Sequence, residues 1–199
     1  MDAAFSLLDL HGADVEPWLD GLGELRISVF REYPYLYDGT LEYEREYLRT
    51  YVNTPDSLVV LVVDAAKQVV GATTCLPLRD EGPEFQAPFL SAGYEVNSVC
   101  YFGESILLPQ WRGQGLGKEF FKRRVAHAQK LGCKWSAFCA VDRMAEHPSR
   151  PPGYRVLDDF WVSQGYQKHP ELQATFVWKE IGEESESPKT LTFWLKDLS

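Results

Sequence analysis

The spacing of apolar residues changes from one segment of the chain to the next, and each spacing predicts a type of element. The segment SLVVLVVDA is continuous and rich in β-branched residues, which is typical of a strand buried on both faces. The segment LEYEREYLRTYV instead places Leu41, Leu48 and Val52 on one side of an amphipathic helix. By the same criteria, strands are predicted over 5–10, 57–65, 68–78, 99–108, 133–141, 172–181 and 191–198.

Helical spacing and capping residues predict the remaining elements. Helices are expected over 13–33, 41–52, 118–132 and 157–166, with a short helical piece near 87–93. The sequence contains no internal repeat and no change of composition that would mark a domain boundary. Strands and helices therefore predict one α/β domain over residues 1–199, with a mixed central sheet of about six to seven strands flanked by helices.

Composition and charge exclude several classes of partner. The net charge is −9 and the isoelectric point is near 5.0, whereas nucleic-acid binding needs a basic surface. The four cysteines form no C-x-x-C pair and no metal-ligand spacing with the four histidines. The longest apolar run, 58–63, is far shorter than the roughly 20 residues that a membrane span requires, and the start carries no basic leader. We expect a cytoplasmic protein with free thiols that binds no nucleic acid, membrane or metal.

A glycine-rich stretch separates one predicted strand from the next helix. GESILLPQWRGQGLGKEFFKRR, residues 103–124, has three glycines at alternating positions, which neither a helix nor a strand favours. Glycines in such a place let the backbone approach a ligand, often a phosphate, at a helix N-terminus. The Walker A pattern fails because Gly117-Lys118 is followed by Glu119. The dinucleotide pattern fails because its third glycine position holds Lys118.

The remaining pattern, Arg-x-x-Gly-x-Gly in RGQGLG, resembles the signature of the GNAT superfamily of acetyl-CoA-dependent N-acetyltransferases. In that family the signature lies between the fourth strand and the third helix, and the order of predicted elements resembles the GNAT fold along almost the whole chain. The resemblance implies acetyl-CoA as the acyl donor. It also implies that the coenzyme contacts the loop residues Arg112, Gly113, Gln114, Gly115, Leu116, Gly117 and Lys118.

The loop also makes physical sense as an anion site. Successive backbone N–H groups of residues 112–117 can turn toward a pyrophosphate, and a helix dipole adds about 0.3–1 kcal/mol. Lys118 lies in the first helical turn, where a cation opposes the dipole, and Lys122, Arg123 and Arg124 follow. A bound polyanion would explain these cations, and so would a solvated basic face.

The strand before the loop carries the candidate chemistry. The resemblance implies that the backbone of Ser105, Ile106 and Leu107 holds the pantetheine arm and can polarise the thioester carbonyl. Glu104 is the only carboxylate in this otherwise apolar strand, and we expect it to deprotonate the acceptor amine, directly or through water. A glutamate that merely faces outward or forms a buried ion pair is the alternative.

A general acid is harder to assign. Many GNAT enzymes have a tyrosine in the last helix, four residues before a Gly-aromatic pair, where this chain has Trp161. Tryptophan cannot supply a useful acid proton. Tyr154, Cys139 or water could protonate the leaving thiolate, or the thiolate could leave without help.

The acceptor site is predicted in the connection between the first two helices, REYPYLYDGT, which commonly borders the acceptor in this fold. Tyr33, Tyr35 and Tyr37 with Asp38 could form an aromatic and acidic wall for a cationic amine. Exposed tyrosines packed over the edge of the sheet would give the same pattern.

These features predict an enzyme that transfers an acetyl group directly from acetyl-CoA to the amine of a small molecule or peptide. A non-catalytic acyl-CoA-binding sensor is the alternative, motivated by Trp161, and a longer acyl donor is a third reading. The sequence leaves open whether the protein is a monomer or a homodimer.

Overall fold

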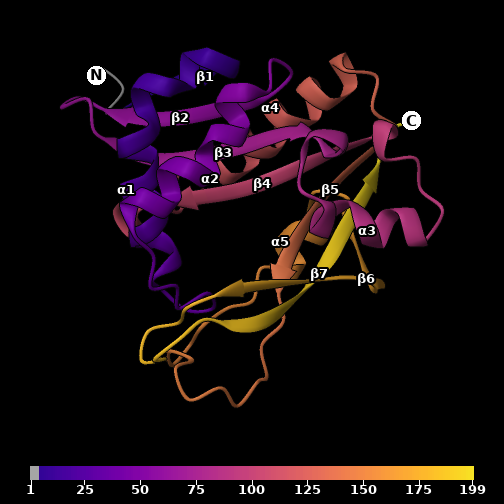
Figure 1. The fold of residues 1–199 in the computed structure, drawn as a ribbon. Helices are drawn as coiled ribbons and strands as arrows, with labels where there is room; N and C mark the ends of the chain where they lie inside the picture. Colours follow the sequence, from indigo (N-terminus) through magenta and orange to yellow (C-terminus); the bar gives the residue numbers. More distant parts are fainter. Residues whose placement is uncertain (1–4) are drawn as a thin grey trace.

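Seven strands form one mixed sheet within residues 5–199, the part of the chain described by the computed structural model (Figure 1). Their order across the sheet is β1-β2-β3-β4-β5-β7-β6, and only β4 and β5 pair in parallel. The strands are β1 (Phe5–Leu10), β2 (Leu58–Asp64), β3 (Val69–Pro77), β4 (Val99–Leu107), β5 (Trp135–Val141), β6 (Gln167–Trp178) and β7 (Ser187–Asp197). The predicted α/β class and mixed sheet are confirmed.

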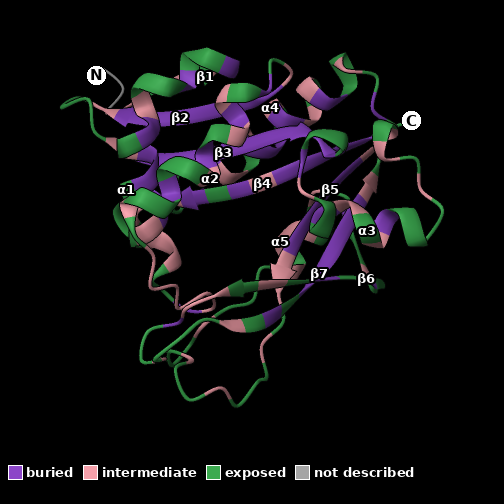
Figure 2. Ribbon diagram, viewed as in Figure 1, coloured by how far each residue is buried: buried purple, intermediate pink, exposed green. Residues whose placement is uncertain are grey.

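Helices cover both faces of this sheet (Figures 1 and 2). They are α1 (Leu19–Phe30), α2 (Leu41–Asn53), α3 (Pro83–Ser91), α4 (Leu116–Lys130) and α5 (Asp158–Ser163). One apolar cluster joins the sheet to α1, α2 and α3, and a second joins it to α4 and α5. In β2, Val59 and Leu61 belong to the first cluster, whereas Val60 and Val62 belong to the second. Burial on both faces explains the continuous apolar run of this strand.

The first predicted helix differs from the observed one. Residues Gly12–Trp18 form a 3₁₀ helix, and the α-helix begins only at Leu19. Pro17 accounts for the difference, because proline has no backbone N–H and disfavours the α conformation of the residue before it. The described residues contain no helix that is both long enough and apolar enough to cross a membrane.

The two central strands diverge after a short paired segment. β4 and β5 pair only over Val99–Tyr101 and Trp135–Ala137. Beyond Tyr101, β4 continues to Leu107 while pairing with β3, and β5 continues to Val141 while pairing with β7. The sheet therefore opens into a gap between the second half of β4 and the second half of β5 (Figure 1).

A β-bulge lies in β4 at the start of this gap. The β3–β4 register shifts between Thr73 and Cys75, opposite Gly103 and Glu104. The bulge inserts one residue, so Tyr101 and Ile106 both belong to the cluster on the α1–α2 face despite their odd separation. A Cβ atom on Gly103 would lie only 2.2 Å from the Tyr51 hydroxyl, and only glycine fits there.

Candidate active site

The loop before α4 presents a row of free backbone donors. Gly113 and Gly115 adopt left-handed conformations with φ of 77° and 82°, and Gly115 is the N-cap of α4. No acceptor within residues 5–199 hydrogen-bonds to the amide N–H groups of residues 113–117. A Cβ atom added at Gly113 or Gly115 would meet only open space. Consecutive free amides at a helix N-terminus form an anion-binding cradle, and this one suits a pyrophosphate.

The flanking residues of the loop are held by the protein itself. The amide of Arg112 donates to the Pro109 carbonyl, and that of Lys118 donates to the Gly115 carbonyl. The Arg112 guanidinium donates to Glu32 Oε2 at 3.0 Å and to the Leu107 carbonyl at 3.0 Å. Arg112 therefore ties the loop to the end of α1 and to β4, and five amides of the predicted six remain free.

Two of the cations further along α4, Arg123 and Arg124, contact side chains of the protein itself. Arg123 contacts Glu119 at 2.9 Å and also pairs with Asp9. The guanidinium of Arg124 is buried, and its central carbon lies 4.4 Å and 4.8 Å from the ring centres of Phe102 and Phe121. These contacts place both arginines in the packing of α4 against the sheet.

Glu104 lies in a buried cluster of charges on the α1–α2 face. Its Oε2 is 2.7 Å from Nη1 of Arg26, and its side chain is only 2% exposed. The same guanidinium donates to Glu44 from α2 and lies over the ring of Tyr47, 4.3 Å from its centre. Oε1 of Glu104 has no hydrogen-bond partner within the described residues. Burial raises the pKa of Glu104, and the opposing effect of Arg26 is smaller.

Glu104 lines a cavity of about 430 Å³ on the α1–α2 face of the sheet. Its walls are mostly aromatic and apolar, with few charges. They comprise Arg26, Phe30, Tyr35, Tyr37, Tyr43, Tyr47, Glu84, Phe85, Tyr101, Gly103, Glu104, Cys139, Thr175, Phe176, Val177, Trp178 and Leu191. A cavity of this size and composition can hold a small amine or the end of a longer one.

The free amides, the gap beside β4 and the aromatic cavity all lie along β4 or directly after it. The family model for the acetyltransferase (GNAT) family matches residues 23–151. The chain belongs to the GNAT family. This result confirms the resemblance that RGQGLG indicated. Membership of the family supports a general role in acetyl transfer.

Solved structures share this fold at low sequence identity. Ribosomal-protein-alanine N-acetyltransferase from Brucella melitensis superimposes with a TM-score of 0.60 at 16% identity, covering 96% of this chain and 99% of that one. A GNAT acetyltransferase from Staphylococcus aureus Mu50 gives 0.58 at 9% identity, covering 98% and 100%. A Salmonella typhimurium protein solved with its cofactor acetyl-CoA gives 0.54 at 12%, covering 99% and 95%. A sequence search against curated proteins finds no match.

The four predicted acceptor residues of this GNAT protein separate into two groups. Tyr35 and Tyr37 line the cavity, whereas Tyr33 and Asp38 are absent from its walls. The ring of Tyr33 packs edge-on against Tyr154, with ring centres 4.7 Å apart. Asp38 instead forms ion pairs with Arg31 at 3.2 Å and with Lys179 at 3.3 Å. The connection between α1 and α2 thus supplies two residues of the cavity wall and two residues that pack or pair elsewhere.

The candidate proton donors lie in different surroundings. Tyr154 lies outside the cavity walls, and burial raises its pKa. Cys139 lines the cavity with its Sγ 3.2 Å from the Tyr101 hydroxyl, and burial raises the pKa of its thiol to about 12. Trp161 packs against Phe138 and Trp194 in the α4–α5 cluster, so this position is structural.

Several residues of the site are absent from the sequence-based prediction. Arg26 and Glu44 come from two helices, and nothing in their local pattern marks them as buried partners of Glu104. Glu81, just before α3, is 8% exposed, and burial together with the nearby Glu104 raises its pKa to about 8. The high charge density of α2 gives no signal of burial either, because such density usually indicates a solvated face.

Proposed function

We propose that this GNAT protein transfers the acetyl group of acetyl-CoA directly to the amine of a small molecule or peptide bound in the aromatic cavity. One observation carries the proposal: β4 joins the two halves of the site. Glu104 on β4 lines the cavity, and the same strand ends at Leu107, shortly before the free amides of residues 113–117. An acyl donor held by those amides and by the open edge of β4 would meet an amine beside Glu104.

The residues present fit the coenzyme. Acetyl-CoA supplies an activated acyl group, and the amides of residues 113–117 would bind its pyrophosphate. The backbone of Ser105, Ile106 and Leu107 pairs with β3 on one side, and its other side borders the gap without pairing to β5. This open edge can bind the pantetheine arm and donate to the thioester oxygen as negative charge develops.

In this proposal Glu104 acts as the general base. An alkylammonium with a pKa near 10.4 costs roughly 4–5 kcal/mol to deprotonate at pH 7. The free Oε1 of Glu104 can accept this proton while Arg26 holds Oε2. The amine nitrogen then bonds to the acetyl carbon as the carbon–sulfur bond breaks. The nitrogen releases its second proton to water, and the leaving thiolate takes a proton from water or from Tyr154.

Coenzyme binding and turnover test the proposal separately. Gly115→Asp adds a carboxylate where the pyrophosphate would lie, so we expect calorimetry to show loss of acetyl-CoA binding. Gly93→Asp is the matched control, because Gly93 has a similar φ of 83° and equally open surroundings outside the loop. Both variants carry the same backbone strain and charge. Equal acetyl-CoA affinity in wild type and a folded Gly115→Asp variant would refute the loop assignment.

A screen of thiol release from acetyl-CoA against a panel of amines tests turnover. Release that depends on an added amine supports the enzyme. Tight coenzyme binding without release for any amine would favour the sensor alternative, which rests on the structural packing of Trp161.

A further inference from the structure

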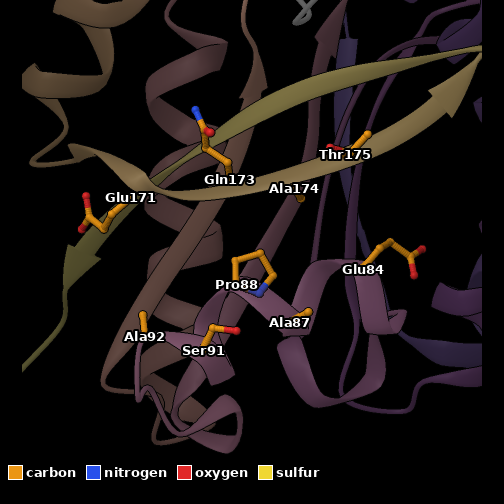
Figure 3. Close-up of a pocket in the computed structure, with 9 residues that line it drawn as sticks. All are labelled: Glu84, Ala87, Pro88, Ser91, Ala92, Glu171, Gln173, Ala174 and Thr175. Carbon is orange, nitrogen blue, oxygen red and sulfur yellow. The ribbon is translucent and has the colours of Figure 1, made fainter.

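The acceptor cavity opens into a second hollow. A groove of about 770 Å³ runs between α3 and β6 (Figure 3). It is lined by Glu84, Ala87, Pro88, Ser91, Ala92, Glu171, Gln173, Ala174 and Thr175. Glu84 and Thr175 line both the groove and the cavity, so the two hollows meet at this pair. Glu84 thus stands at the mouth of the cavity.

The charges around the cavity do not balance. Its walls carry one cation, Arg26, and two carboxylates, Glu84 and Glu104. Arg26 is also paired with Glu44, which is fully buried. Glu44 and Glu104 each keep one buried oxygen without a hydrogen-bond partner in the described residues. Glu84 is exposed and forms no ion pair with any described residue. Three carboxylates against one guanidinium leave two negative charges, and a monocation would offset only one.

The wall between the two carboxylates is apolar. Phe85, Phe176 and Leu191 belong to it and offer no partner for a polar linker, and the hydroxyl of Tyr101, also in this wall, contacts Cys139 Sγ at 3.2 Å. Burying an unpaired polar group there would be unfavourable, whereas a methylene chain would be stabilised by contact. Tyr43 also lines the cavity and can bind a cation over its ring, whereas the Trp178 ring already has Lys189 Nζ 5.4 Å from its centre.

We propose that the acceptor is a linear aliphatic diamine or polyamine whose reacting amine lies at Glu104 and whose second ammonium lies at Glu84. This inference rests on the proposed acetyl transfer and names its acceptor class. The free oxygen of Glu104 holds one ammonium, the apolar wall holds the methylene chain, and Glu84 holds the second ammonium where the groove begins. Additional carbon and nitrogen atoms of a longer polyamine extend into the groove.

Glu84 also lies in the first turn of α3, where a carboxylate stabilises the helix dipole. The test must therefore separate an effect on the preference for diamines from an effect on the stability of the protein. Glu42→Gln is the matched control, because Glu42 is exposed in the first turn of α2 and does not line the cavity.

The experiment compares kcat/KM for n-alkylamines and α,ω-diamines of equal chain length. We expect wild type and Glu42→Gln to prefer the diamine by about three- to fivefold, the size of one exposed charge contact, and Glu84→Gln to lose this preference. Diamine affinity by calorimetry should fall in parallel in Glu84→Gln. Equal kcat/KM for both series in wild type would overturn the diamine proposal and leave acetyl transfer intact.

Two other results have distinct meanings. Diamine binding that depends on Glu84 without any turnover would overturn acetyl transfer and support Glu84 as the site of the second ammonium. A preference for lysine-containing peptides over diamines, lost in Glu84→Gln, would overturn the small diamine as the acceptor.

Discussion

Glu104→Gln is the substitution that addresses the proposed chemistry most directly. In the wild type, Arg26 Nη1 lies 2.7 Å from Glu104 Oε2. Gln keeps the size of the side chain and an oxygen that can accept a hydrogen bond from Arg26. It removes only the ability to take a proton. At pH 7 the neutral fraction of an amine with a pKa of 10.4 is about 10⁻³, so an enzyme without a base acts on that fraction alone. We expect kcat/KM to fall by about 10²–10⁴.

The pH dependence distinguishes a base from a structural glutamate. Burial raises the pKa of Glu104, so wild-type activity should rise with pH at a value above the ordinary range of a glutamate. In Glu104→Gln the rise should instead follow the pKa of the amine. The ratio of wild-type to Glu104→Gln kcat/KM should therefore fall by about tenfold for each pH unit between 7 and the amine pKa. The measurement is kcat/KM for one amine from pH 6 to pH 10.

Glu44→Gln provides the matched control. Glu44 contacts the same guanidinium from α2 but does not line the cavity. We expect this variant to lower the melting temperature and to keep the dependence of activity on a base, with the rise in activity moved to lower pH because the Glu44 charge helps to raise the pKa of Glu104. A pH-independent defect of equal size in both variants would show that the carboxylates only maintain the buried cluster, and it would refute the role of Glu104 as a base.

Three further predictions concern other parts of the site. Glu81 has a pKa of about 8 in the folded protein and 4.5 ordinarily, so its protonation stabilises the fold and this stabilisation is lost as the pH rises toward 8. Glu81→Gln should therefore raise the free energy of unfolding at pH 8 by about 3–5 kcal/mol more than at pH 4.5, as measured by urea denaturation. The prediction is contradicted if the free energy of unfolding changes with pH equally in the wild type and the variant. Gly103→Ala places a Cβ atom 2.2 Å from the Tyr51 hydroxyl and should cost about 1–3 kcal/mol, while retention of the wild-type melting temperature would count against the tight bulge. Tyr154→Phe should lower kcat and leave acetyl-CoA affinity within a few-fold, and an unchanged kcat would remove Tyr154 as the donor.

The elements that the sequence predicts well are those whose pattern reflects a local cause. The apolar run of β2 reflects burial on both faces, and the glycines at 113 and 115 reflect left-handed backbone conformations. Glu104 stood out because it is the only carboxylate in an apolar strand. In each case one segment contains enough information to define its own environment.

The rest of the site depends on contacts between distant segments. Arg26, Glu44 and Glu104 lie on three different elements, and only the packing of α1 and α2 on the sheet brings them together. The same is true of Asp38, whose partner Lys179 follows β6. A single sequence gives no signal for such pairs, because a charged residue on an amphipathic helix is usually solvated.

The bulge at Gly103 is a small backbone feature that determines which face of the sheet carries Glu104. Strict alternation from Tyr101 would put residue 104 on the same face as Phe102, against α4 and the ring-stacked guanidinium of Arg124. The inserted residue moves Glu104 to the opposite face, beside Arg26 and in the wall of the cavity. Glycine is required there because Tyr51 and Thr74 fill the space of a side chain. The gap between β4 and β5 begins beside the bulge, so the carboxylate faces the aromatic cavity next to the free edge of β4.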